Sequence, residues 1–90
     1  MYMIDLNDLD QFPEMTAYSL RNYLNFGTKP GSFLTALLAN DLKNAVTKAD
    51  DENILLIREY VRWLIFNAPD ESWGTYDKVN AWIKEEPNHE

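Results

Sequence analysis

The segment at residues 27–32 constrains the fold most, because its glycines and proline interrupt two stretches of helical apolar spacing. On a structural interpretation Gly27 ends one helix, Pro30 and Gly31 turn the chain, and Ser32 caps the next helix. Alternatively, the unpaired amides and positive dipole at a helix start, approached through glycine, suit a phosphate. Both interpretations stay open, and the structural one is the more common for such a loop.

Helical spacing of apolar residues recurs along the chain, and no segment shows the alternation of a strand. We expect a first helix from Pro13 to Gly27, a second over residues 33–48, a third from Asp50 through Phe66, and a last one capped by Thr75. The expected buried stripes are Ala17, Leu20, Leu24, then Phe33, Leu34, Leu37, Leu38, Leu42, Ala45, Val46, then Val79, Trp82 and Ile83. The predicted fold class is all-α, a small helical bundle with two long antiparallel helices plus shorter N- and C-terminal helices.

Ninety residues correspond to a single domain over residues 1–90. Residues 1–12 read as an acidic arm and residues 85–90 as a frayed tail. The chain has no cysteine, which rules out disulfides and thiolate metal sites. Its first residues carry acids where a signal peptide needs lysine or arginine, and no apolar run approaches membrane-spanning length. We therefore expect a soluble, intracellular protein with no membrane partner.

The net charge of −7 argues against DNA or RNA as a partner, because counterion release requires a basic face. A small anionic ligand is compatible with this charge, since one lysine and a few N–H groups in a closed pocket can outweigh a screened negative surface. The charge can also serve solubility alone, which is the commoner explanation.

The third expected helix carries apolar side chains on more than one face. One set suffices for packing inside the domain: Ile54, Ile57, Val61, Leu64 and Ile65. A second set then needs other cover: Leu55 or Leu56, Tyr60, Trp63 and Phe66. A domain this small cannot bury a helix all round, so the surplus predicts self-association. The alternative is that the last helix, with Trp82 and Ile83, covers this surface.

The sequence offers little for catalysis, and we expect no enzyme activity, no cofactor and no metal site. The one histidine, His89, lies in the tail. The acids at residues 50–52 are explained as a helix start. Asp5, Asp8 and Asp10 resemble the first ligands of a calcium loop, but the glycine and the terminal glutamate of such a loop are missing.

Aromatic residues bracket the glycine-containing turn and indicate a nucleotide ligand. Tyr18, Tyr23 and Phe26 precede Thr28 and Lys29, and Phe33 follows them. Any base can stack on such rings, with about 1–3 kcal/mol per base. The alternative is that most of these rings belong to the core, as aromatics at helical spacing usually do.

Several motifs together resemble a known family. They are Leu20-Arg21-Asn22-Tyr23, Gly27, Pro30-Gly31-Ser32-Phe33-Leu34, Leu38-Ala39-Asn40-Asp41-Leu42, Ala49-Asp50 with Asn53, Val61-Arg62-Trp63-Leu64, Pro69, Trp73-Gly74 and Ala81-Trp82. Over residues 16–84 the chain resembles the phage anti-CBASS sponges, proteins that sequester the cyclic oligonucleotide messengers of bacterial defence. The resemblance implies a homohexamer that holds cyclic dinucleotides such as cyclic GMP–AMP between subunits, and possible separate sites for cyclic trinucleotides. It also implies that the messenger is bound without cleavage, in the cytoplasm of the host bacterium.

The resemblance further implies a tyrosine that stacks on a base and a lysine that meets phosphate. By residue type the best matches are Tyr23 and Lys29, with Tyr18 as a rival for stacking. Thr28 and Ser32 are candidate donors to phosphate oxygens. Arg62 is a candidate for a second anionic site, unless Glu59 neutralises it.

Two other functions stay open. An acidic helical protein could inhibit a host protein by direct binding, as a decoy for nucleic acid, which predicts carboxylates massed on one face. It could also be an adaptor that docks one helix into a partner groove, which predicts a monomer with an exposed stripe.

Overall fold

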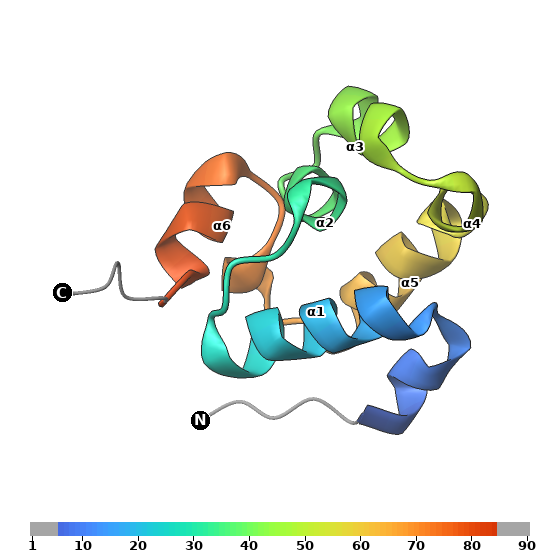
Figure 1. The fold of residues 1–90 in the computed structure, drawn as a ribbon. Coiled ribbons are helices and arrows are strands. Elements are labelled where there is room, and N and C mark those ends of the chain that lie inside the picture. Colours follow the sequence, from blue (N-terminus) through green and yellow to red (C-terminus); the bar gives the residue numbers. More distant parts are fainter. Residues whose placement is uncertain (1–5, 85–90) are drawn as a thin grey trace, which may run out of the picture.

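The computed structural model describes residues 6–84, and this part of the chain is all-helical, as the sequence predicts. Six α-helices and two 3-10 helices follow one another without a strand in the described residues (Figure 1). The elements are η1 (Leu6–Gln11), α1 (Glu14–Phe26), α2 (Ser32–Leu38), α3 (Leu42–Lys48), α4 (Asp51–Ile54), α5 (Ile57–Asn67), η2 (Asp70–Ser72) and α6 (Tyr76–Trp82). In residues 6–84 no helix is both long and apolar enough to cross a membrane.

One continuous apolar core joins η1, α1, α2, α3, α5 and α6. Its centre is a set of rings: Phe12 stacks on Tyr60 with centroids 4.3 Å apart, and Phe33 meets Tyr60 edge-on at 5.7 Å. The other buried apolar residues are Leu9, Leu20, Tyr23, Leu24, Leu34, Ala36, Leu37, Leu38, Ala39, Ala45, Trp63, Leu64 and Val79. The rings bring together residues distant in sequence, so the N-terminal segment is part of the domain.

The expectation of a loose arm over residues 1–12 is wrong for its second half. Residues 6–11 form η1, and Leu9 and Phe12 are 2% and 5% exposed. Their spacing of three puts both on one side of a 3-10 helix, which presses them onto α1 and α5. Residues 1–5, like the predicted tail at residues 85–90, lie outside the described residues.

The second expected helix, over residues 33–48, is interrupted, so it does not supply one of the two long antiparallel helices of the prediction. Asn40 takes a left-handed conformation, with φ of 64°, and Asp41 then caps α3 by accepting a hydrogen bond of 3.2 Å from the backbone N–H of Asn44. Asn tolerates this backbone region and Asp is a favoured N-cap. The break leaves Leu42 and Val46, two predicted core residues, 65% and 45% exposed.

The third expected helix also divides, at Leu55 and Leu56, into α4 and α5. Its predicted start is confirmed, because the Asp50 carboxylate accepts a 2.7 Å hydrogen bond from the backbone N–H of Asn53. The buried Asn53 side chain in turn accepts hydrogen bonds from the hydroxyls of Thr16 and Tyr60. The divided helix is therefore tied to α1 by a buried polar contact.

The partition of apolar residues on α5 differs from the expectation. Tyr60 and Trp63, expected to need outside cover, are buried, whereas Ile65, expected inside, is 62% exposed. Leu55 and Phe66 lack cover, as expected, and are 80% and 75% exposed. The last helix does not cover them, because α6 packs against α2 and η2.

The predicted ends of α1 and α6 are confirmed. Gly27 ends α1 with φ of 73°, and Thr75 accepts a 3.1 Å hydrogen bond from the backbone N–H of Lys78 at the start of α6. The prediction that Ser32 caps the next helix is wrong. Gly31 occupies the cap position of α2, and no side chain bonds there. Ser32 is instead the first residue of the helix.

Candidate functional site

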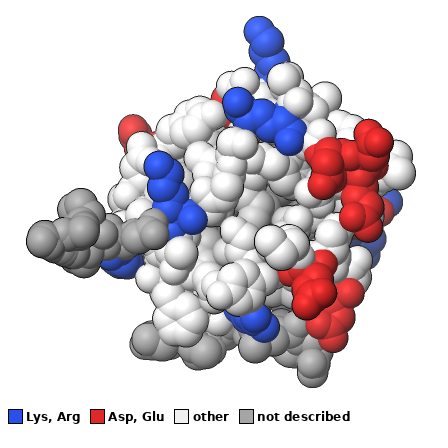
Figure 2. All heavy atoms as spheres, viewed as in Figure 1, with Lys and Arg blue, Asp and Glu red and all other residues white. Residues whose placement is uncertain are grey.

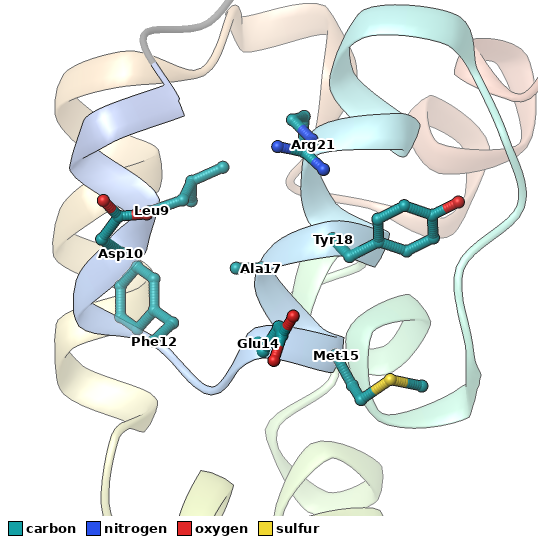
Figure 3. Close-up of a pocket in the computed structure, with 8 residues that line it drawn as sticks. All are labelled: Leu9, Asp10, Phe12, Glu14, Met15, Ala17, Tyr18 and Arg21. Atoms are coloured by element: carbon teal, nitrogen blue, oxygen red, sulfur yellow. The ribbon is translucent and has the colours of Figure 1, made fainter.

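A surface hollow of about 620 Å³ lies on the N-terminal half of α1, beside η1 (Figure 3). Pro13 lies in the turn between η1 and α1, and the two helices run apart from that turn. Its lining residues are Leu9, Asp10, Phe12, Glu14, Met15, Ala17, Tyr18 and Arg21. In Figure 3 the side chains of Met15 and Tyr18 lie on the side of α1 that faces away from η1.

Tyr18 and Arg21 supply a flat ring and a positive charge at this hollow. The Arg21 guanidinium carbon lies 5.6 Å from the centroid of the Tyr18 ring, a cation–π contact between residues one helical turn apart. Tyr18 is 57% exposed, so much of its ring is open to solvent. A ring held beside a guanidinium can stack on a nucleobase while the guanidinium meets an anionic oxygen.

Two carboxylates, those of Asp10 and Glu14, also line the hollow, and both residues are exposed. Their charge opposes a phosphate next to them. A carboxylate can, however, accept hydrogen bonds from the N–H groups on the edge of a base, as Asp and Glu do with cytosine. The hollow therefore offers groups that can bind three parts of a ligand: an aromatic ring, a base edge that carries hydrogen-bond donors and, through Arg21, one negatively charged group.

A second hollow, of about 280 Å³, adjoins the first, and Met15 lines both. It is formed where the beginning of α2 passes α1, and Ser32 and Lys48 are among its lining residues. Both of these side chains are exposed. Ser32 is thus brought toward the Tyr18 side of α1, and Lys48 is a cation that the sequence analysis missed, since it lies sixteen residues further along the chain.

Tyr23, the first-choice stacking residue, is in the core, and its assignment to the site is corrected. The side chain is fully buried, and its hydroxyl donates a 2.6 Å hydrogen bond to the carbonyl oxygen of Ser72. Burial raises the pKa of this hydroxyl. Tyr23 belongs to the buried stripe of α1 with Leu20 and Leu24, so it presents no ring face to a ligand. Of the two tyrosines, Tyr18 is the accessible one.

The turn between α1 and α2 keeps Thr28 and Lys29 exposed, but they line neither of these two hollows. Its first amides are used by the end of α1, where the backbone N–H groups of Gly27 and Thr28 donate to Tyr23 and Asn22. This geometry is that of a helix C-cap. The structural interpretation of Gly27 is therefore confirmed, and the amides of residues 27 and 28 are not offered to a phosphate.

Arg62 lies apart from Tyr18, in a hollow of about 270 Å³ beside α5 and the end of η1. The alternative for Arg62, an ion pair with Glu59, is not formed. Glu59 pairs instead with Arg58, at 3.7 Å. Trp63 lines the same hollow, and its buried indole N–H has no hydrogen-bond partner in the structure. The six predicted site residues are therefore spread over the core, the α1 surface, the turn, the start of α2 and α5.

Ionisable groups with shifted pKa values lie at structural positions. The hydroxyl of Tyr76 donates a 2.5 Å hydrogen bond to the Asp41 carboxylate, which lowers the pKa of Asp41 and raises that of Tyr76. Asp41 also caps α3, so this pair ties α6 to the α2–α3 break. Within residues 6–84 no cluster of three His, Cys, Asp or Glu side chains could hold a metal ion.

A comparison of the chain with protein-family models, curated proteins and solved structures finds no match. The resemblance to the sponge family therefore rests on the sequence motifs alone.

Proposed function

We propose that this protein binds a cyclic oligonucleotide messenger at the hollow beside η1 that Tyr18 and Arg21 line, here called the Tyr18 hollow. It sequesters the messenger without cleavage, as a phage counter-defence protein in the host cytoplasm. The observation that carries the proposal is the open Tyr18 ring with Arg21 beside it, on the rim of a hollow of about 620 Å³. Ligand pockets commonly have volumes of about 300–1,000 Å³. Sequestration acts by mass action, because the defence effector responds only to free messenger.

In the proposed complex a base stacks on Tyr18, and Arg21 meets a phosphate oxygen. Glu14, four residues before Tyr18 on α1, accepts from the N–H groups of the base, which favours guanine because its Watson–Crick edge carries adjacent donors. Ser32 and Lys48, in the hollow that shares Met15, provide a hydroxyl and a charge for a further phosphate. Arg21 is half-buried, and the other groups in these roles are exposed in the single chain.

A homo-oligomer is part of the proposal. One chain leaves the hollow open, and a cyclic dinucleotide carries two phosphates that need more positive charge than Arg21 provides. A neighbouring subunit would cover the ligand and could bring Thr28 and Lys29, which stand on an exposed turn. Exposed apolar residues such as Leu55 and Phe66 are available for assembly. The resemblance implies six subunits.

The role of Lys29 is tested by Lys29→Ala. The substitution should weaken cyclic dinucleotide binding in titration calorimetry and leave the mass of the assembly unchanged, because the side chain is exposed. An affinity equal to that of the wild type would remove Lys29 from the site.

A second candidate function, direct inhibition of a host protein, is favoured by the distribution of acids. On the face shown in Figure 2, Asp and Glu gather toward the side where α4 lies in Figure 1, and most Lys and Arg atoms lie elsewhere on that face. Asp50, Asp51 and Glu52 are consecutive and exposed. Such a surface could occupy a basic site on a host protein.

The two functions are separated by two variants in the same infection assay of a host that carries the defence system. If messenger binding matters, Tyr18→Ala abolishes protection of the phage and a double variant, Asp51→Lys with Glu52→Lys, retains it. If the acidic surface matters, the outcome is reversed.

A further inference from the structure

One stripe of exposed side chains follows α5 and the turn before it. Glu59, Arg62 and Phe66 are spaced by three and four residues, which places them on one face of α5, and Leu55 lies four residues before Glu59 in the break that precedes the helix. Glu59, Arg62 and Phe66 line the same hollow, confirming that they share a face. Leu55 has helical backbone angles, φ of −77° and ψ of −11°, whereas Leu56, which follows it, departs from them with φ of −113° and ψ of 7°. We call these four residues the α5 stripe.

The α5 stripe is open in the single chain. Leu55 is 80% exposed and Phe66 is 75% exposed. The side chain of Glu59 is 40% exposed, and its ion pair with Arg58 is long, at 3.7 Å. Such exposed pairs are weak, so Glu59 can exchange its partner at little cost. Two large apolar side chains at the ends of a charged pair make a surface that gains free energy from being covered.

The order of the α5 stripe is symmetric. Counted from the midpoint between Tyr60 and Val61, Leu55 and Phe66 lie equally far away, and so do Glu59 and Arg62. A two-fold axis through that midpoint, perpendicular to the helix, lays a second copy of α5 antiparallel on the first. In that register each apolar residue faces an apolar one and each charge faces its opposite, as an isologous contact requires.

We propose that the α5 stripe is the contact with a second copy of this chain. Glu59 pairs with the partner subunit's Arg62, and Phe66 packs against the partner subunit's Leu55, each contact occurring twice. The charge order argues for this occupant. A nucleic acid backbone would meet Arg62 but would be repelled by Glu59, and it would leave both apolar ends uncovered. The proposal rests on the self-association in the proposed function and names the surface that forms it.

Charge exchange across the two-fold axis tests the contact. In the variant Glu59→Arg, each of the two charge contacts brings two arginines together. In the variant Arg62→Glu, each of the two contacts brings two glutamates together. Each single variant should raise the dissociation constant about tenfold or more in sedimentation equilibrium, because two attractive contacts become repulsive. The double variant, Glu59→Arg with Arg62→Glu, restores both pairs and should associate like the wild type.

An equimolar mixture of the two single variants gives the sharpest result. A chain with two arginines facing a chain with two glutamates has both pairs restored, so a heterodimer should form where neither variant associates alone. Lys43→Glu on α3 is the charge-matched control for Arg62→Glu. Phe66→Ser should also weaken association, and Leu42→Ser, at a residue 65% exposed, is its control. Both controls should retain wild-type association.

A wild-type monomer at all accessible concentrations would overturn the contact. So would single variants that associate normally, or a double variant and a mixture that are not restored. Wild-type affinity for cyclic dinucleotides is measured on the same samples. If the protein binds messenger but its association is unaffected by the charge variants, only the proposed contact is refuted. If association changes with the charge variants as expected but no messenger binds, only the proposed sequestration is refuted.

Discussion

The hydroxyl of Tyr23 on α1 donates a hydrogen bond of 2.6 Å to the carbonyl oxygen of Ser72 in η2, across 49 residues of sequence. The backbone carbonyl of Tyr23 also accepts a 2.8 Å hydrogen bond from the indole N–H of Trp82. Tyr23 thus fixes η2 and α6 onto α1, which is a structural role for a residue whose type suggests ligand stacking.

Tyr23→Phe should therefore lower stability and leave ligand binding intact. Loss of the buried hydroxyl removes one hydrogen bond and leaves an acceptor less satisfied, a cost of about 1–3 kcal/mol in the free energy of unfolding. Urea denaturation followed by tryptophan fluorescence measures it. A variant as stable as the wild type but unable to bind messenger would return Tyr23 to the site.

Tyr18→Ala should have the opposite effect. We expect affinity for a cyclic dinucleotide to fall by about tenfold to a hundredfold, the loss of one stacked base, without a matching loss of stability. Phe26→Ala is the matched control, because Phe26 lies on the same helix with 58% exposure against 57% for Tyr18 and does not line the hollow. Calorimetric titration of both variants with a cyclic dinucleotide measures the difference. Equal affinities of Tyr18→Ala and Phe26→Ala for this ligand would exclude stacking on Tyr18.

The glycines of the turn should respond differently to alanine. At Gly27 a Cβ would lie 2.5 to 2.8 Å from atoms of Lys84, and φ is +73°. Gly27→Ala should cost about 1–3 kcal/mol of stability, since both the backbone and the close neighbour resist it. At Gly31 a Cβ meets nothing within 4 Å and φ is −71°. Gly31→Ala should be neutral or stabilising by about 0.4–1 kcal/mol. Equal thermal midpoints would contradict this difference.

The Asp41–Tyr76 pair should make stability depend on acid pH. The hydrogen bond from Tyr76 lowers the pKa of Asp41 in the folded chain. The stabilisation is therefore fully present above the unfolded pKa, about 3.9, and is lost as the pH falls through the lowered folded value. Tyr76→Phe should be less stable than the wild type at pH 6, and the difference should shrink toward pH 2.5. Urea denaturation across this range measures it, and a constant difference would show that Asp41 does not carry the effect.

The sequence predicts the helical class and most of the caps because these depend on neighbouring residues. Asp50, Thr75 and Gly27 act where local chemistry places them. The break at Asn40 was missed because the apolar spacing continues across it. Just before the break, the carbonyl oxygen of Leu38 accepts a hydrogen bond from the backbone N–H of Gly74, a contact between residues distant in sequence.

The candidate site was predicted in part. Residue type pointed to tyrosines near the turn, but which tyrosine is open depends on the rotation of α1 against the core. The hydrogen bonds that tie Tyr23 to Ser72 and Trp82, both distant in sequence, hold α1 in that rotation. The adjacency of Arg21 to Tyr18 follows from helical spacing and could have been found in the sequence. The position of Lys48 beside Ser32 depends on the course of α3 and could not.

The most direct test of sequestration is to incubate the protein with a panel of cyclic di- and trinucleotides, remove the unbound fraction, denature the protein by heat and chromatograph what is released. The proposal expects a cyclic dinucleotide, guanine-containing by the acidic lining of the hollow, to be retained and recovered intact. Recovery of no ligand from the whole panel, or of linear products in place of the cyclic messenger, would contradict it.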